Sequence, residues 1–415
     1  MFLAAGGRPW SSTRRGSRDE RGADTIDPGE GCGVRATTVA DRRSRSRRTA
    51  TVQGGRLNRE IATFAAAGDV QLGDSAICPG FGVASRIGRH GADRLFAGIV
   101  QQLSADLTIV NLETMLSSAG LEDADWASMQ MRGHREYAGT LARVGVTVAS
   151  VANNHALQHG REAFADTVSA LEEAGIGVCG VRGTAPWTSR PLGLEVRGLS
   201  IGILGYSLRP RQYSDEEPPY AEGNRSGMIA DIRRLSGRGQ HVVLSLHWGE
   251  EFVDRPSMAE VDLGHELIQA GASLIVGHHP HVLRPVESYR GGVIAYSLGN
   301  LVSDMVWYDP LRTGGILKGE LRASGGIANL ELVRTRIGDD FTPRMVDGVD
   351  DLGSETPGGL DAESYSRAVS ETVSAQRRGA YAYALRNLHR YPGRLLVQLA
   401  RRTARNKLMA LAGRS

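Results

Sequence analysis

The chain repeats a pattern in which a short apolar run ends in residues that carry oxygen or nitrogen donors. The apolar runs cover residues 61–67, 107–110, 146–152, 240–246 and 272–276. Amphipathic helical patterns at 161–174 and 261–270 separate some of them. Short buried strands that alternate with helices predict an α/β fold with parallel strands. The carboxyl ends of such strands meet at one edge of the sheet, where ligands bind.

Five successive strand ends carry polar side chains of the kinds that bind metals. They present Asp69, then Asn111 with Glu113, Asn154 with His155, His247, and finally His278, His279 and His281. A single Gly-Asp or Asn-His pair is more often an ordinary turn. Five such ends in a row are hard to reach by chance, so the pattern predicts one shared polar site.

Residues 278–281 concentrate three of the chain's 11 histidines in one loop. Neutral imidazole is the commonest nitrogen ligand of zinc, manganese, iron and nickel in proteins. An isolated His-His-Pro-His could equally be a loop whose imidazoles hydrogen-bond to backbone or water. Because the cysteines Cys32, Cys78 and Cys179 are widely spaced, a Cys-x-x-Cys zinc site is excluded and any metal must use nitrogen and oxygen ligands.

The two ends of the chain differ in composition from its middle. Residues 1–58 are rich in Arg, Ser, Gly and Asp, and predict a disordered tail because they cannot bury enough apolar surface to offset their ordering entropy. Aromatic residues are not regularly interleaved with the arginines of the tail, so it is not expected to bind nucleic acid. A solvated tail, or an upstream extension from a misassigned start codon, accounts for it better.

After residue 302 the pattern of strand and polar end stops. Alternating stretches at 315–322 and 327–333 predict two antiparallel strands that close the second sheet. Residues 339–359 are polar and predict a linker, and residues 360–415 predict a basic helical extension broken at 391–393. Its last part, 394–409, has an apolar stripe and an arginine-rich face, which suits peripheral contact with anionic lipid or packing on the domain.

The length of the hydrophobic runs predicts where the protein is located. None reaches the roughly 18 residues that would span a membrane. The first five residues lack the basic flank and the apolar length of a secretory signal. The sequence by itself therefore predicts a cytoplasmic or peripheral membrane protein.

Six motifs, in this order, carry a family resemblance. They are Gly-Asp-Val-Gln-Leu-Gly (68–73), Val-Asn-Leu-Glu-Thr (110–114), Ala-Asn-Asn-His (152–155), Ser-Leu-His-Trp-Gly-Glu (245–250), Gly-His-His-Pro-His-Val (277–282) and Tyr-Ser-Leu-Gly-Asn (296–300). Their succession resembles the CapA family of bacterial capsule or poly-γ-glutamate synthesis proteins, within the calcineurin-like metallophosphoesterase superfamily. The resemblance covers about residues 61–302 and implies a four-layer α-β-β-α sandwich. We therefore expect a CapA-like domain over residues 59–338.

The resemblance also implies a dinuclear metal centre. The implied metal ligands are Asp69, Glu113, Asn154, His247, His279 and His281; the implied catalytic residues are His155, as acid or phosphate contact, and Asn154; further candidates are Asn111, His278, Glu250 and Asn300. Which of the clustered histidines bind metal stays open, because the loop has one residue more than the superfamily's Gly-His-x-His. Two divalent ions, manganese, iron or zinc, are the expected cofactors.

Three departures from the superfamily pattern bear on activity. Gln71 stands where the first motif usually has histidine, Asn111 and Glu113 represent the bridging aspartate, and Gln158 stands where CapA proteins generally have aspartate. A lost ligand weakens a divalent site, so we expect one of the two ions to bind weakly.

Two functions follow from the resemblance. The first is metal-dependent phosphoester hydrolysis in the biosynthesis of a capsule or poly-γ-glutamate type polymer. The second is a non-catalytic factor that keeps the fold and a weakened metal site while it binds the polymer or its synthase. The implied partners are an anionic polymer or phosphoester substrate and a synthase complex, and the implied location is the cell envelope.

Overall fold

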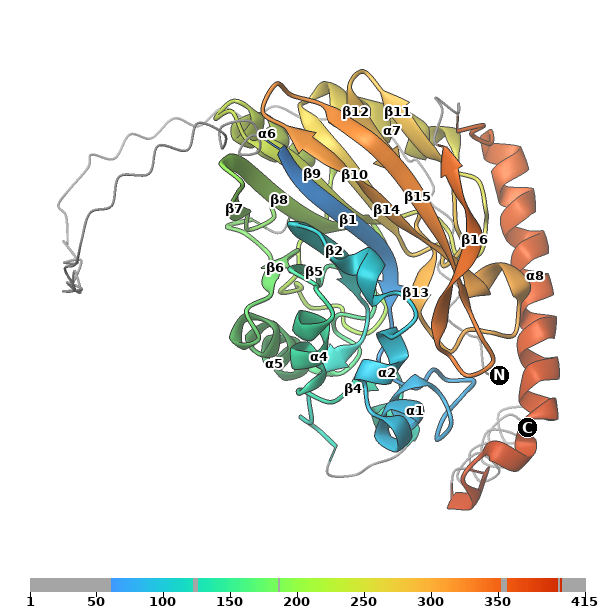
Figure 1. Ribbon diagram of the computed structural model, residues 1–415. Helices are drawn as coiled ribbons and strands as arrows, with labels where there is room; N and C mark the ends of the chain where they lie inside the picture. Colours follow the sequence, from blue (N-terminus) through green and yellow to red (C-terminus); the bar gives the residue numbers. More distant parts are fainter. Residues whose placement is uncertain (1–60, 122–125, 186, 352–356, 395, 398–415) are drawn as a thin grey trace, which may run out of the picture. The chain divides into compact units, whose positions relative to one another are not determined.

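The computed structural model describes residues 61–121, 126–185, 187–351, 357–394 and 396–397 (Figure 1). The tail expected at 1–58 lies outside these residues, and so do residues 398–415, which include most of the basic stretch expected to contact lipid. Two sheets, with helices packed on their outer faces, form the described part. This arrangement confirms the predicted α/β sandwich.

The first sheet contains β1 at its centre. Its strand order is β16 (Pro343–Asp351), β15 (Ile327–Ile337), β14 (Thr313–Arg322), β1 (Ile61–Val70), β2 (Leu107–Leu112), β5 (Val148–Ser150) and β6 (Gly177–Cys179), with β13 (Asn300–Val302) also paired to β1. Strands β1, β2, β5 and β6 are parallel, whereas β14, β15 and β16 are antiparallel. Four strand carboxyl ends therefore meet at one edge, as in doubly wound folds.

The second sheet is parallel in its middle and antiparallel at both edges. Its order is β11 (Val286–Tyr289), β12 (Gly292–Ala295), β10 (Ala272–His278), β9 (His241–His247), β8 (Leu199–Ser207) and β7 (Leu192–Val196). A separate small ribbon pairs β3 (Met115–Leu116) with β4 (Arg132–Gly133). In the second sheet His247 and His278 are opposite each other at the ends of β9 and β10.

Clusters of buried apolar side chains hold the layers together. Phe64 and Ile109 of the first sheet pack against Ile203 and Val276 of the second. The outer face of the first sheet is covered by α1 (Val83–His90), α2 (Asp93–Phe96), α4 (Tyr137–Arg143) and α5 (Gly160–Glu173), and that of the second by α6 (Arg225–Ser236) and α7 (Met258–Gln269). Because the central strands are buried on both faces, they read as continuous apolar runs in the sequence.

Two expectations for the C-terminal third are wrong. The strands β14 and β15 extend the first sheet, next to β1, and do not close the second one. The segment expected as a linker at 339–359 contains β16, which pairs with β15 along most of its length. The polar composition of the segment hides this strand because β16 is the outermost strand of its sheet, and an edge strand needs little apolar sequence.

The long helix α8 (Ala362–Arg386) is connected to the sandwich at both ends. The hydroxyl of Tyr365 accepts a hydrogen bond from the backbone of Glu250 at 3.0 Å, and that of Tyr391, beyond the helix, donates to the Ile77 carbonyl at 2.6 Å. A 3-10 turn at Leu388–Arg390 follows α8, near the predicted helix break. Further short elements are α3 (Trp126–Met129) and 3-10 turns at Val100–Leu103 and Asp309–Arg312.

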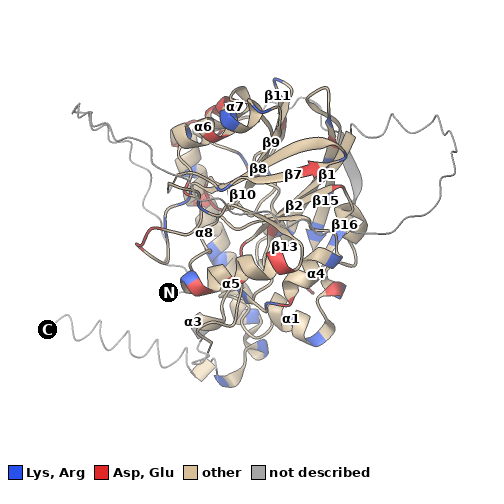
Figure 2. Ribbon diagram, turned by 90° about the vertical axis from the view of Figure 1, so that its left-hand side faces the viewer, with Lys and Arg blue, Asp and Glu red and all other residues tan. Residues whose placement is uncertain are grey.

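The helices of the described part are too polar or too short to cross a bilayer. In the view of Figure 2, acidic and basic residues are interspersed over them. Many of these residues form surface ion pairs, such as Arg143 with Asp93 at 2.8 Å and Arg135 with Glu173 at 2.6 Å. Exposed pairs of this kind contribute little to stability.

Candidate metal centre

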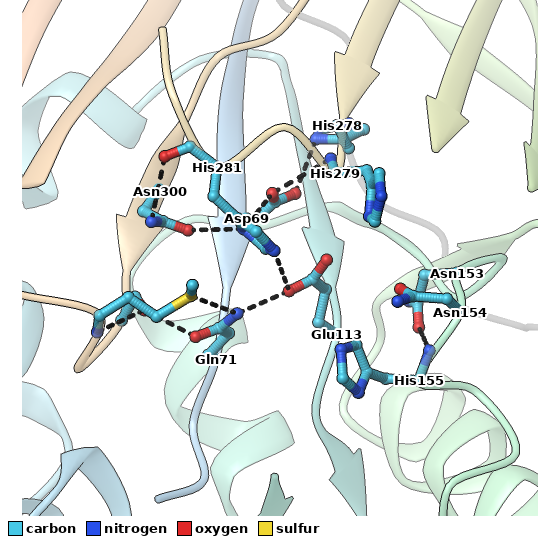
Figure 3. A network of polar contacts seen from close by, with 12 residues as sticks. Asp69, Gln71, Glu113, Asn153, Asn154, His155, His278, His279, His281 and Asn300 are labelled. Atoms are coloured by element: carbon cyan, nitrogen blue, oxygen red, sulfur yellow. Dashed lines mark hydrogen bonds and ion pairs between the residues drawn. The ribbon is translucent and has the colours of Figure 1, made fainter. Parts of the chain in front are cut away.

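The predicted site residues converge at the facing strand ends of the two sheets (Figure 3). Asp69 at the end of β1 lies opposite Asn111 of β2 on one side and Asn300 of β13 on the other. His247 and His278 come from β9 and β10 of the second sheet. The loops after β2, β5 and β10 add the remaining side chains, Glu113, Asn154, His155, His279 and His281.

Asp69 is fully buried among imidazole rings. Its Oδ1 accepts a hydrogen bond from Asn111 Nδ2 at 2.8 Å and lies 3.3 Å from His278 Nδ1, while its Oδ2 lies 3.1 Å from His281 Nδ1. Burial alone would raise the pKa of Asp69, but the His278 and His281 rings bring it below its ordinary value. Asp69 therefore stays a carboxylate, the form that binds a cation.

Glu113 turns its two oxygens toward different neighbours. Its Oε1 lies 3.5 Å from His247 Nε2, and its Oε2 accepts a hydrogen bond from Gln71 Nε2 at 2.7 Å. We call Glu113, Asn154, His247 and His279 the imidazole half of the site, and Asp69, Gln71, Glu113 and His281 the carboxylate half. Glu113 belongs to both, which is the position of a bridging ligand.

The imidazole half combines a hydrogen-bonded His247 with unpaired ring nitrogens on His279. His247 Nε2 lies 2.8 Å from Asn154 Oδ1, and the rings of His247 and His279 are 4.7 Å apart. Burial lowers the pKa of both His247 and His279 well below the ordinary value, so both are neutral at neutral pH. Metal binding requires this neutral form.

The carboxylate half is closed by its own hydrogen bonds. His281 Nδ1 lies 3.0 Å from Asn300 Oδ1, and Ser303 Oγ donates to Gln71 Oε1 at 2.6 Å. Burial followed by the charge of Asp69 raises the pKa of Glu113 to about 8. Burial opposes a charge on His281, but Glu113 and Asp69 raise its pKa to about 10. The raised pKa values mean that Glu113 and His281 both tend to hold a proton, which offsets the negative charge of Asp69.

Several buried polar atoms at this point have no hydrogen-bond partner in the structure. They are Glu113 Oε1, both ring nitrogens of His278 and both ring nitrogens of His279. Buried polar atoms are nearly always paired, so a cluster of unpaired ones at one place fits a bound cation. Donor atoms of Glu113, His247 and His279 lie within 4.8 Å of one another, as do those of Asp69, Glu113 and His281. The residues therefore fit two cations that share Glu113.

The loop that carries the histidines is strained. His279 has φ 94° and His281 has φ 59°, in the left-handed region that favours glycine. Such residues cost of order 1–3 kcal/mol each and cluster at functional sites. The backbone of this loop therefore orients the imidazoles of His279 and His281 at a cost in stability.

The structure separates the further candidates. Asn111 and Asn300 contact Asp69 and His281, and His278 lies beside Asp69, so all three border the centre. Glu250 does not: its carboxylate accepts two hydrogen bonds from Arg209, at 2.9 and 3.1 Å. The neighbouring Glu251, which the sequence argument missed, has a carboxylate oxygen within 4.8 Å of ring nitrogens of His279 and His281. Phe252, the next residue, has φ 72° and marks a turn of the backbone that sequence periodicity does not reveal.

His155 lies outside the clusters of donor atoms. Its Nδ1 is 2.7 Å from Gln158 Oε1 and 3.4 Å from the hydroxyl of Tyr213. Burial lowers the pKa of His155 to about 4. The loop that contains Tyr213 also contacts Asn154, through Gln212 at 3.2 Å. This loop therefore forms one wall of the site.

Two facing sheets with carboxylate, amide and imidazole donors at their strand ends are the architecture of calcineurin-like metallophosphoesterases. The family described as bacterial capsule synthesis protein PGA_cap matches residues 63–305, more than half of the chain. The chain belongs to this family, and the predicted resemblance to CapA proteins is confirmed.

Three curated relatives show the extent of the similarity. The capsule biosynthesis protein CapA of Bacillus anthracis is 28% identical over 259 residues, 60% of this chain and 61% of the relative. The PGA biosynthesis protein CapA of Bacillus subtilis strain 168 is 29% identical over 225 residues, 53% and 59% of the two chains. A probable polyglutamine synthesis accessory protein of Mycobacterium tuberculosis is 27% identical over 263 residues, 58% and 68% of the two. The matched part thus spans about 60% of the length of the first two relatives.

Proposed function

We propose that this protein is a metal-dependent phosphoesterase that acts in the biosynthesis of a capsule or poly-γ-glutamate type polymer. One observation supports the chemical part of the proposal. The ring nitrogens of His279 and an oxygen of Glu113 are buried and unpaired beside His247, at strand ends where the resemblance implies a metal centre. The biological part is supported by the relatives, which are named for capsule and PGA biosynthesis.

The residues of the two halves would hold the ions. Asp69, Glu113 and His281 surround one position, and Glu113, Asn154, His247 and His279 surround the other. Mixed carboxylate, amide and imidazole ligands suit manganese, iron or zinc. When bound, two such ions supply Lewis-acid stabilisation of a phosphoryl group and lower the pKa of water toward neutrality.

The remaining residues orient the substrate and move a proton. His155 lies next to Asn154 and would donate a proton to the leaving oxygen or bind a phosphate oxygen. Its low pKa means that it reaches the acid form only when a negatively charged substrate stabilises the added proton. Arg209, whose charge acts on His279, lies close enough to contribute to the binding of an anionic ester.

Hydrolysis of an aryl phosphate diester and monoester by the manganese-loaded protein tests the enzymatic proposal. We expect turnover that a Asp69→Ala variant lacks, because this variant loses a buried carboxylate of the metal site. A matched Asp339→Ala variant, changed at an exposed position whose side chain is 90% accessible, should retain activity. Equal rates for the wild-type and Asp69→Ala proteins would refute the proposal.

A non-catalytic role in polymer assembly is the second candidate, and one observation favours it. The Gln71 amide is held by Glu113 and Ser303 where the superfamily has a histidine ligand, and Gln158 leaves His155 without a carboxylate partner. A scaffold protein should support polymer production with both Asp69 and His247 changed to alanine. An enzyme should not.

The resemblance implies an anionic polymer or phosphoester and a synthase complex as partners, and the composition of residues 394–409 adds anionic lipid. Deletion of residues 398–415 tests the lipid contact while it keeps Tyr391, which anchors the chain to Ile77. If the lipid contact exists, the shortened protein leaves vesicles that contain phosphatidylglycerol. Unchanged partitioning refutes it.

A further inference from the structure

Glu251 lies in the loop after β9 with a carboxylate that has no role in the fold. Its side chain forms no hydrogen bond or ion pair with any other residue in the described ranges. The backbone beside it is fixed, because Phe252 N–H donates to the Pro280 carbonyl at 2.8 Å and Trp248 N–H to the His278 carbonyl at 3.1 Å. The loop therefore holds Glu251 next to the histidine loop without using its charge.

The groups that face Glu251 are two imidazoles, and the nitrogens of one of them, His279, are unpaired. One carboxylate oxygen of Glu251 and one ring nitrogen each of His279 and His281 lie within 4.8 Å of one another. His279 is 1% exposed and neither of its ring nitrogens has a hydrogen-bond partner. Two imidazoles and one carboxylate around a common point are a frequent ligand set for iron, manganese and zinc.

The adjacent Glu250 shows that this placement is specific. Glu250 turns outward, where its carboxylate binds the Arg209 guanidinium, and its side chain is 43% accessible. Glu251 turns inward: burial raises its pKa, and the charges of His281 and Arg209 lower it. Two consecutive glutamates thus occupy different environments: Glu250 is hydrogen-bonded to arginine, and Glu251 faces the histidine loop.

The carboxylate half is the part of the centre that lacks a ligand. Because Glu113 accepts a hydrogen bond from Gln71 Nε2, the amide oxygen faces away from it, toward Ser303, and does not serve as a donor to an ion beside Glu113. This leaves Asp69, Glu113 and His281 around that position. A fourth donor must come from another element.

We propose that Glu251 is a metal ligand of this centre, and that its carboxylate completes the coordination of the ion beside His281 in place of a side chain at position 71. The proposal rests on the proposed function, since it requires that the strand ends bind divalent ions. Glu251 comes from the second sheet and Asp69 from the first, so this ion joins the two sheets.

Manganese binding to the wild-type, Glu251→Gln and Glu250→Gln proteins tests the ligand assignment. Glutamine keeps the size of the side chain and removes its charge, and at position 250 it can still hydrogen-bond to Arg209. Electron paramagnetic resonance titration counts free Mn2+ and gives both dissociation constants without any measurement of activity. We expect the weaker constant of Glu251→Gln to rise roughly tenfold or more, and that of Glu250→Gln to stay unchanged.

Three results are decisive. A rise confined to Glu251→Gln supports the proposal. If the wild-type and Glu251→Gln proteins bind two ions equally well, or if both variants lose affinity equally, the ligand assignment is wrong while the metal centre stands. If the wild-type protein binds no manganese, zinc or iron, the proposed function and the ligand assignment both fail. Circular dichroism spectra of the three proteins verify that each one is folded.

Discussion

The two halves of the centre differ in what their donor atoms do before a metal arrives. In the imidazole half, both nitrogens of His279 and one oxygen of Glu113 are unpaired. In the carboxylate half, His281 lies at hydrogen-bond distance from Asn300 and Asp69, and Gln71 donates to Glu113. A cation that enters the first half would replace the hydrogen bond between His247 and Asn154, whereas in the second half it would displace a proton and several contacts.

This difference indicates unequal affinities. Neutral His247 and His279 are ready to bind, whereas His281 has a pKa raised to about 10 and must first lose its proton. We therefore infer a tight ion in the imidazole half and a weak ion in the carboxylate half. The sequence predicts one weak ion from the departures at Gln71 and Gln158, and we infer that the carboxylate half would hold it.

The His247→Ala variant should have the largest effect, because it removes a neutral nitrogen from the half that binds first. We expect loss of the tight ion and a fall in hydrolysis greater than the roughly 10–100-fold typical of residues outside the coordination sphere. Metal analysis after dialysis and kcat/KM for an aryl phosphate diester measure both. His134→Ala, at a position whose side chain is 65% accessible, is the control. Loss of the weak ion alone would reverse the assignment of the halves.

The Gln71→His variant should make the two halves more alike. An imidazole at this position offers the lone pair that the amide does not, so we expect the weaker dissociation constant for Mn2+ to fall roughly tenfold. Calorimetric titration measures it, with Gln269→His on the exposed side of α7 as the matched control. An unchanged constant would mean that the closed hydrogen bonds, and not the missing ligand, limit this half.

The Gln158→Glu variant tests the proton supply on the imidazole side. The carboxylate would take the place of an amide oxygen that lies 2.7 Å from His155 Nδ1, and a negative partner raises the pKa of an imidazole. Because the wild-type pKa is about 4, more of the acid form should then exist at pH 7. We expect this variant to hydrolyse an aryl phosphate diester several-fold faster at pH 7. The alkaline limb of its pH–rate profile should lie at higher pH than that of the wild type. A rate profile without any shift would remove His155 as the acid.

The supports behind the two halves should differ in their response to pH. Behind the histidine loop, the buried Arg284 forms an ion pair with Glu260 at 2.7 Å. Behind Gln71, the residue after Ser303 is Asp304, and its carboxyl group feels the charge of another acid, Asp74. Burial and the charge of Asp74 raise the pKa of Asp304 to about 7. Asp304 has a pKa of about 4 in the unfolded chain, so the folded state keeps its proton to a higher pH than the unfolded chain does. The free energy of unfolding therefore falls as the pH rises from about 4 to about 7.

An Asp304→Asn variant should lose this pH dependence. At pH 8 we expect it to be more stable than the wild type by on the order of 2 kcal/mol, because it removes a buried charge. Urea unfolding at pH 5 and pH 8 measures the difference. Asp339→Asn, at an exposed position, should leave both values unchanged. If Asp304→Asn destabilises the protein equally at both pH values, its carboxylate is a structural acceptor and not a source of pH dependence.

Much of the sandwich follows from the sequence because its central strands are buried on both faces. Runs such as 107–110 and 272–276 are apolar at consecutive positions, and each is followed by the donors that the structure brings together. The convergence of Asp69, Glu113, His247 and His279 follows from parallel strands that end at a common edge. Their roles as ligands stay predictions, since only their positions are described.

What the sequence does not reveal depends on contacts between distant segments. The strand β16 is polar and gains its place only by pairing with β15, so composition alone predicted a linker. The choice between Glu250 and Glu251 depends on Arg209, which lies about 40 residues earlier and takes the first carboxylate. Local periodicity contains no information about either pairing.

The hydroxyl of Tyr365 has a practical consequence for anyone who trims this protein. It contacts the backbone of Glu250 and the guanidinium of Arg284, so a residue 115 positions downstream holds the loop that presents Glu251. A shortened gene product that ends at residue 305, where the family similarity stops, would lack this brace together with β14, β15 and β16. Inactivity of such a fragment would report on its missing scaffold, and not on the chemistry of the domain.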